Sequence, residues 1–189
     1  MLKHMSVAIR ITIASIIVFG LIYPFVMTGL AQLLFPNQAN GSLVRVNGKV
    51  VGSEIIGQLW SKPQYFHGRP SAAGKGYDPT ATGGTNLGPT SKKLIDSTRA
   101  TIAQLKKENP NASGPPPMDL ITSSGSGIDP DISPQGAYYQ AARVASARGL
   151  PITRVNALIA SHIQGRQLGF LGEPRVNVLD LNLALDGMH

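Results

Sequence analysis

Three residues of the chain could in principle form an acyl-transfer triad. Ser126 stands between Gly125 and Gly127, and Asp129 and His162 follow it along the chain. In such a triad the histidine accepts the serine proton and the aspartate orients the histidine. The five-residue turn Gly-x-Ser-x-Gly, which exposes the nucleophile in one large class of hydrolases, is absent. We therefore expect a simple glycine-serine turn here and keep a membrane-anchored hydrolase as the minor alternative.

Two further motifs resemble ligand-binding loops and fail on particular residues. Residues 68–75 approximate a nucleotide phosphate loop, but one residue too many separates the glycines, and Gly76 occupies the place of the magnesium-binding Ser or Thr. Residues 129–133 begin like a calcium loop, but Pro134 and Gln140 replace the required Gly and Glu. The four histidines are not spaced as metal ligands. The sequence predicts no catalytic residue and no metal site, and identifies no nucleotide-binding residue.

A glycine-rich segment lies within a long irregular region, residues 63–89. Its residues 82–86, Thr-Gly-Gly-Thr-Asn, could present backbone N–H groups to an anion, although a tight turn is the simpler reading. Loops of this length are either functional or disordered. Tyr65 and Phe66 favour an ordered loop.

A membrane span must precede these loops. Residues 11–44 contain no Asp, Glu, Lys, Arg or His, and residues 11–34 are mostly apolar. These 24 residues would reach about 36 Å as a helix, enough to cross a bilayer. A cleavable signal peptide would have a shorter apolar region and an Ala-x-Ala-like site, which is missing. Lys3 and Arg10 predict that residues 1–10 stay in the cytoplasm and that residues 35–189 lie outside it.

The second half of the span carries small and polar residues. Small residues allow a neighbouring helix to approach closely, and Pro24 would kink the helix. The amide of Gln32 needs a partner in hydrocarbon, or else lies at the hydrated interface. We take as candidate partner-interface residues Gly20, Tyr23, Pro24, Thr28, Gly29 and Gln32.

The outer part reads as an α+β domain with a small sheet and about three to four helices. Asn47-Gly48 predicts a hairpin over residues 43–51, and Ser53 would cap a short helix over residues 54–60. Apolar periodicity predicts a helix over residues 91–108, followed by a linker at 109–117. Further helices are expected from Ser133-Pro134 to Arg148-Gly149 and from Thr153 to about 164. Residues 175–186 could be strand or helix.

Composition excludes several classes of protein. The 189 residues carry a net charge of +7, but the basic residues are scattered rather than clustered, which argues against a nucleic-acid partner. Without cysteine the chain has no disulfide and no lipoprotein anchor.

Motifs along nearly the whole chain resemble one family, the C subunit of the Kdp potassium-transporting ATPase. In the first half they are Tyr23-Pro24, Thr28, Ala31-Gln32, Pro36, Gln38-Ala39, Gly41-Ser42, Val51-Gly52-Ser53, Ile56-Gly57-Gln58, Pro63, Tyr65-Phe66, residues 69–72, Gly83-Gly84 and residues 86–89. In the second half they are Asp119-Leu120, Thr122, Ser124, Ser126-Gly127, Asp129-Pro130, Ile132-Ser133, Gln140, residues 143–145, 147–149, 171–178 and 181–186. Thr82 and Thr85 replace the more usual Ser, and Asp131 stands where the family usually has His.

The resemblance implies an accessory subunit of a high-affinity, ATP-driven potassium pump in the bacterial cytoplasmic membrane. Its partners would be a potassium-selective A subunit, a P-type ATPase B subunit and a small F subunit. ATP and potassium would be used by the whole complex, and this chain alone would bind no cofactor tightly. The family is described as a catalytic chaperone that raises the ATP affinity of the B subunit through a transient ternary complex. In the loops we take as candidate functional residues Arg69, Gly83, Gly84, Asn86, Asp129 and Arg143.

The predicted topology is in tension with that role. ATP is cytoplasmic, whereas only about ten residues of this chain should be. Coupling must then pass through the span, or the outer domain must act elsewhere. One such alternative is a purely structural role over the potassium entrance, as β-type subunits have in related pumps.

Overall fold

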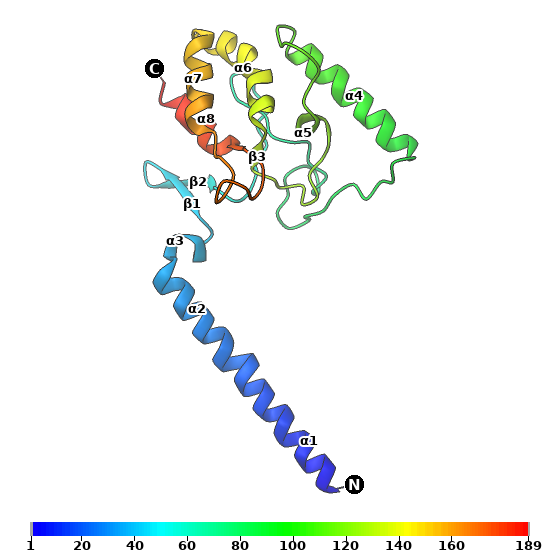
Figure 1. The fold of residues 1–189 in the computed structure, drawn as a ribbon, viewed down its shortest axis with the longest axis vertical. Coiled ribbons are helices and arrows are strands. Elements are labelled where there is room, and N and C mark those ends of the chain that lie inside the picture. Colours follow the sequence, from blue (N-terminus) through cyan, green and yellow to red (C-terminus); the bar gives the residue numbers. More distant parts are fainter. Residues whose placement is uncertain (1, 189) are drawn as a thin grey trace. The chain divides into compact units, whose positions relative to one another are not determined.

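The computed structural model describes residues 2–188, and it divides the chain into two compact units, residues 1–51 and 52–189. The first unit is dominated by one long helical rod, and the second holds all the helices from α4 (Lys92–Glu108) onward (Figure 1). This confirms the predicted fold class, in which one N-terminal apolar helix is followed by an α+β domain with a small sheet and several helices.

The rod is made of α1 (Leu2–Ser15), the π-helix η1 (Ile16–Ile22) and α2 (Tyr23–Leu34). The part from Lys3 to Leu34 spans 32 residues and is long and apolar enough to cross a membrane. Its apolar side chains are exposed, from Val7 to Leu34. Exposure of this kind is expected of a helix whose solvent is lipid.

The π-helical segment explains how the rod accommodates Pro24. A proline has no N–H, and its ring clashes with the carbonyl four residues earlier, here that of Gly20. Just before it, the Tyr23 N–H donates to Val18, five residues back, so the turn is wider than in an α-helix. The proline is thus accommodated by a π segment.

After the rod, a one-turn helix α3 (Pro36–Ala39) leads into strands β1 (Leu43–Val46) and β2 (Lys49–Ser53), which pair as a hairpin. At its turn, Asn47 and Gly48 have φ values of 51° and 77°. Both values lie in the left-handed region that a two-residue turn requires. The predicted hairpin is confirmed.

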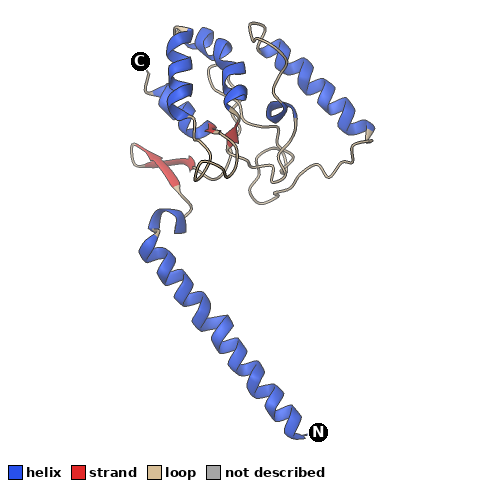
Figure 2. Cartoon of the chain, in the orientation of Figure 1, coloured by secondary structure: helices blue, strands red, loops and turns tan. Residues whose placement is uncertain are grey.

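The second unit contains four longer helices, one short helix and a minimal sheet within the described residues (Figure 2). The elements are α4 (Lys92–Glu108), α5 (Met118–Ile121), β3 (Asp131–Ile132), α6 (Pro134–Arg148), α7 (Ile152–His162), β4 (Val176–Asn177) and α8 (Val178–Asp186). Strands β3 and β4 are antiparallel, with Asp131 opposite Asn177 and Ile132 opposite Val176. The helices predicted over 91–108 and from Ser133-Pro134 are therefore confirmed.

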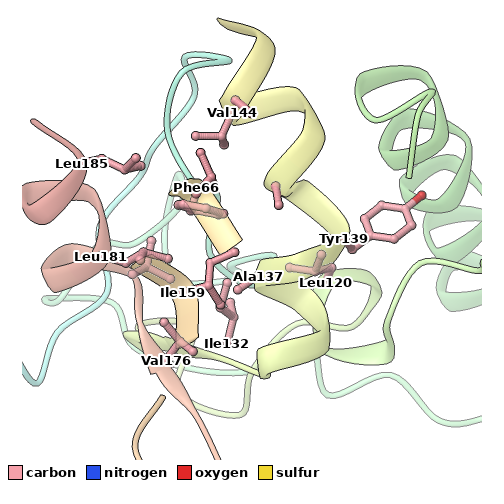
Figure 3. Close-up of a cluster of buried hydrophobic side chains, with 14 residues drawn as sticks. Phe66, Leu120, Ile132, Ala137, Tyr139, Val144, Ile159, Val176, Leu181 and Leu185 are labelled. Atoms are coloured by element: carbon pink, nitrogen blue, oxygen red, sulfur yellow. The ribbon is translucent and has the colours of Figure 1, made fainter. Parts of the chain in front are cut away.

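The core of this unit lies between α6, α7, α8 and the β3–β4 pair (Figure 3). Phe66 enters it from the long loop and is fully buried. Its neighbours in the buried cluster include Leu120, Val144, Ile159, Leu181 and Leu185. The long irregular region is therefore anchored in the core, as its aromatic residues predicted.

Side-chain caps set the starts of two helices. The Ser133 hydroxyl accepts the Gly136 N–H at 2.9 Å, and α6 ends at Gly149 with φ 64°. The Asn177 carboxamide oxygen accepts the N–H groups of Leu179 and Asp180, so α8 begins directly after β4. The tail is thus a two-residue strand followed by a helix.

Two sequence expectations are wrong. Residues 54–60 form no helix, because the Gly57 N–H donates to the Ile128 carbonyl at 2.8 Å and is not available to a helical turn. Thr153 does not cap α7, which begins at Ile152 after Pro151.

Candidate functional site

Two buried side-chain amides hold the long loop in place. Asn182, from α8, accepts the Phe66 N–H at 2.8 Å and donates to the Phe66 carbonyl at 3.0 Å. Gln140, from α6, makes the same pair of bonds with His67, at 2.8 and 3.0 Å. Asn182 and Gln140 are 0% and 1% exposed. Two consecutive loop residues thus have their backbone groups paired by side chains in place of a neighbouring strand.

Beyond His67 the loop meets the glycine-serine segment, residues 123–129. Arg69 and Asp129, two of the predicted functional residues, form an ion pair with 2.9 Å between Nη1 and Oδ2. The Ser71 hydroxyl donates to the Gly127 carbonyl and accepts the Tyr77 N–H at 2.7 Å. The Tyr77 hydroxyl donates to the Arg69 carbonyl at 2.6 Å, and burial raises the pKa of Tyr77 to about 12. These contacts fix the two loops against each other.

The glycine-rich segment belongs to the same contact. The Gly83 N–H donates to the Ser126 carbonyl at 2.8 Å. A Cβ on Gly84 would lie 3.3 Å from the Gly125 carbonyl oxygen, and one on Gly127 would lie 2.7 Å from the Ala73 Cβ. Asn86 follows with φ 52°, a left-handed value that Asn tolerates. This geometry fits the turn interpretation, because the Gly83 N–H is already used within the chain.

Arg143 lies apart from this cluster. Its guanidinium donates to the carbonyls of Pro63 and Tyr65, to Asn109 at the end of α4 and to Gln140. Burial lowers the pKa of Arg143, and its hydrogen-bond partners are chain atoms on several sides. Its contacts are those of a residue that joins the loop, α4 and α6.

Arg148 plays a comparable part at the next turn of α6, although the sequence did not single it out. Its guanidinium donates to the Gln64 and Leu185 carbonyls, and Nη2 lies 2.7 Å from Oδ1 of Asp186. The guanidinium carbon also lies 4.9 Å from the centre of the Tyr65 ring.

A pocket of about 420 Å³ opens beside the loop, and the near-miss phosphate segment lines part of it. Its walls include Trp60, His67, Arg69, Lys75 and Glu108. Burial is the main cause that lowers the pKa of His67, and the positive charge of Arg143 adds to it. The Nδ1 atom of His67 lies 3.6 Å from the Glu108 carboxylate. The Trp60 Nε1–H and Arg69 Nε–H groups have no partner and are themselves buried. The pocket lining is therefore mixed, with charged side chains of both signs beside apolar ones such as Leu105 and Leu120.

The structure does not assemble the hydrolase triad. The Ser126 hydroxyl accepts the Ile128 N–H, Asp129 pairs with Arg69, and His162 Nδ1 lies 2.8 Å from the Leu158 carbonyl. The three side chains therefore have separate partners. Within residues 2–188 no group of three or more His, Asp or Glu side chains could hold a metal ion.

In the span, Gln32 has a partner in its own chain. Its carboxamide oxygen accepts from Asn40 Nδ2 at 3.1 Å, and Asn40 Nδ2 also donates to the Pro36 carbonyl. A Cβ on Gly29 would meet nothing within 4 Å, whereas one on Gly20 would lie 3.8 Å from Ile16. Tyr23 and Pro24 begin α2, and Thr28 lies on it beside Gly29.

One apolar helix suited to single-pass anchoring, followed by an α+β domain whose long loop is held by buried amides and ion pairs, is the architecture of a membrane-anchored accessory domain. The chain matches, over residues 5–187, the model of the KdpC family, described as "K+-transporting ATPase, c chain". The chain belongs to this family.

Relatives of similar length support the assignment. A protein of Koribacter versatilis is 50% identical over 188 residues, covering 99% of this chain and 96% of the relative. One of Myxococcus xanthus is 54% identical over 180 residues, covering 95% of this chain and 85% of the relative. One of Caulobacter vibrioides is 53% identical over 190 residues, covering 100% and 95%. Each is named as a potassium-transporting ATPase KdpC subunit.

Proposed function

We propose that this chain is the accessory C subunit of an ATP-driven potassium pump. The observation that carries the proposal is the roughly half-identical match along almost the whole chain to relatives named as such subunits. Its partners would be the A, B and F subunits, with ATP hydrolysed by the B subunit and not by this chain. The pump would lie in the bacterial cytoplasmic membrane, with the domain that follows the span on the outer side, since Lys3 and Arg10 precede the span.

Stabilisation of the assembled complex is the role that the geometry supports best. The candidate loop residues Arg69, Asp129 and Gly83 make contacts within the chain, so the loops form a rigid surface suited to docking. The open space beside Gly29 would allow a partner helix to approach α2.

A change in the ATP affinity of the B subunit is the second candidate role. It would require a coupling free energy between sites on opposite sides of the membrane, typically about 1–3 kcal/mol or roughly 5- to 150-fold in affinity. The π-helical segment next to Pro24 supports this role, because π-helical turns are frequently found at functional sites. The span would then be the coupling element.

The experiment co-expresses the full chain with its A, B and F subunits and compares it with a chain whose span, residues 11–34, is replaced by an unrelated apolar helix that still anchors the domain. The complex should form, hydrolyse ATP in response to potassium and lose stability when this chain is omitted. Failure of the unaltered chain to co-purify would contradict the subunit role. If the replaced span preserves both assembly and apparent ATP affinity, the span carries no coupling and the role over the potassium entrance is favoured.

A further inference from the structure

The connection between α7 and β4, drawn in orange in Figure 1, is exposed at every residue from 164 to 175 and yet regularly hydrogen-bonded. At its base, Gln164 and Arg175 exchange two backbone hydrogen bonds of 2.8 and 3.0 Å. Nearer the tip, Gln167 and Leu171 exchange two more, both of 2.9 Å. We call residues 164–175 the tip hairpin. These two pairs of backbone hydrogen bonds show that the segment is an ordered hairpin that projects from the domain.

Ion pairs brace the sides of the tip hairpin. Arg166 Nη2 donates to both carboxylate oxygens of Glu173, at 2.9 and 2.7 Å. Arg175 Nε lies 3.1 Å from the Asp131 carboxylate and 3.2 Å from the Gln164 carboxamide oxygen. The base is thus tied to β3, and the two sides of the projection are paired with each other.

The end of the tip hairpin is apolar. Leu168 is 83% exposed, Phe170 is 69% exposed and Leu171 is 47% exposed. Leu168 also has φ 53°, a left-handed conformation that is disfavoured for a branched side chain. Exposed apolar side chains on a backbone held in a disfavoured conformation are typical of binding elements.

The charges of the tip hairpin favour a protein partner over a lipid surface. A loop that inserts into anionic lipid carries surplus Lys or Arg beside its apolar tip. Here Arg166 is balanced by Glu173, which is itself 79% exposed, and Arg175 is balanced by Asp131. The apolar side chains at the end of the hairpin are thus flanked by charges that balance each other. This arrangement fits an apolar cleft with a polar rim on another protein.

We propose that the tip hairpin docks Leu168, Phe170 and Leu171 into an apolar cleft of a partner subunit of the ATPase complex. The proposal rests on the proposed function, because it takes the occupant to be one of the subunits that the pump would contain. It assigns the larger share of the docking energy to this projection, beside the surface formed by the loops around Arg69.

A photo-crosslinking amino acid placed at position 170 of the full chain, co-expressed with the A, B and F subunits, tests the contact. We expect a light-dependent adduct with the summed mass of this chain and one partner subunit. The same amino acid at Met118, which is 66% exposed, is the matched control and should give much less. Adducts with lipid or with this chain alone, no adduct, or equal yields at both positions would overturn the proposal.

A double variant measures how much the apolar side chains of the tip hairpin contribute to binding the complex. Replacing Leu168→Ser together with Phe170→Ser should reduce the retention of the chain in the complex after dilution by about tenfold or more. Met118→Ser should leave retention unchanged, and both variants should keep the thermal unfolding midpoint of the parent, because the replaced side chains are exposed. Undiminished retention of the double variant would overturn the proposal. If the parent chain itself fails to co-purify, the proposed function fails first, so the two failures are distinguishable.

Discussion

Asn182 shows how a single side chain can determine the path of a long loop. In Asn182→Ala, the Phe66 N–H and C=O would be left unpaired in the core, at about 1–3 kcal/mol for each group. We expect the free energy of unfolding to fall by about 2–6 kcal/mol. Urea unfolding of the full chain in detergent, followed through the fluorescence of Trp60, measures this change. The control Asn111→Ala removes an exposed amide and should have almost no effect.

His67 predicts a pH dependence of stability. Its pKa is lowered in the folded chain by burial and then by the charge of Arg143, so below a pH of about 6.5 the unfolded state takes up a proton that the folded state resists. This contribution to stability is complete above that pH and declines as the pH falls toward the lowered pKa. Unfolding midpoints between about pH 7.5 and about pH 5.5 should therefore decrease.

The matched variant for this test is His67→Gln, which cannot be charged. Its midpoints should fall less steeply over the same range, because the proton uptake of the unfolded state is removed. An unaltered slope would show that other groups cause the decrease.

The residue scale also shows the limits of reading the sequence. Arg69 and Asp129 were chosen as functional-loop residues and do meet, although 60 residues separate them. Arg143, chosen with them, contacts Pro63 and Asn109 in another place. Gln140 was noted as a mismatch to the calcium loop and as a match to the family, and Asn182 only within a matching segment. Neither was expected to hold the loop, because a polar residue on a helix gives no local sign that its amide will be buried against a distant loop.

At the scale of elements, local signals were sufficient for some parts and not for others. The Asn47-Gly48 turn and the Ser133 cap depend on neighbouring residues, so the hairpin and α6 were predicted correctly. The expected helix over 54–60 failed because Gly57 is paired with Ile128, far along the chain. Strands β3 and β4 have two residues each, too few to leave an alternating pattern.

The span gives a prediction at the same scale. Replacing Gly20 and Gly29 together with Leu should fill the space available to a partner helix and weaken association by roughly tenfold. Co-purification with the A, B and F subunits measures this. Val18→Leu adds bulk within the π segment and away from Gly29, so it is the control and should associate normally. Equal yields for all three chains would remove the span from the interface.

The placement of the domain across the membrane can be tested on the whole molecule. The chain has no cysteine, so Ser113→Cys introduces a single thiol at an exposed position in the turn-rich segment before α5. Because Lys3 and Arg10 precede the span, we expect this thiol to react with a membrane-impermeant reagent in intact cells. A cysteine at Ser6 should react only after lysis. Labelling at position 113 that also requires lysis would reverse the topology.

The two amide clamps have a consequence for the order of events during synthesis. Phe66 and His67 leave the ribosome long before their partners, which lie 116 and 73 residues further along. Until α6 and α8 exist, the loop has no side chains to pair its backbone, and Phe66 has no core to enter. The domain therefore cannot fold progressively from its N-terminal side, as many nascent chains do. The core around Phe66 cannot close until residue 182 has been synthesised, so nearly the whole chain is made before the domain reaches its final packing.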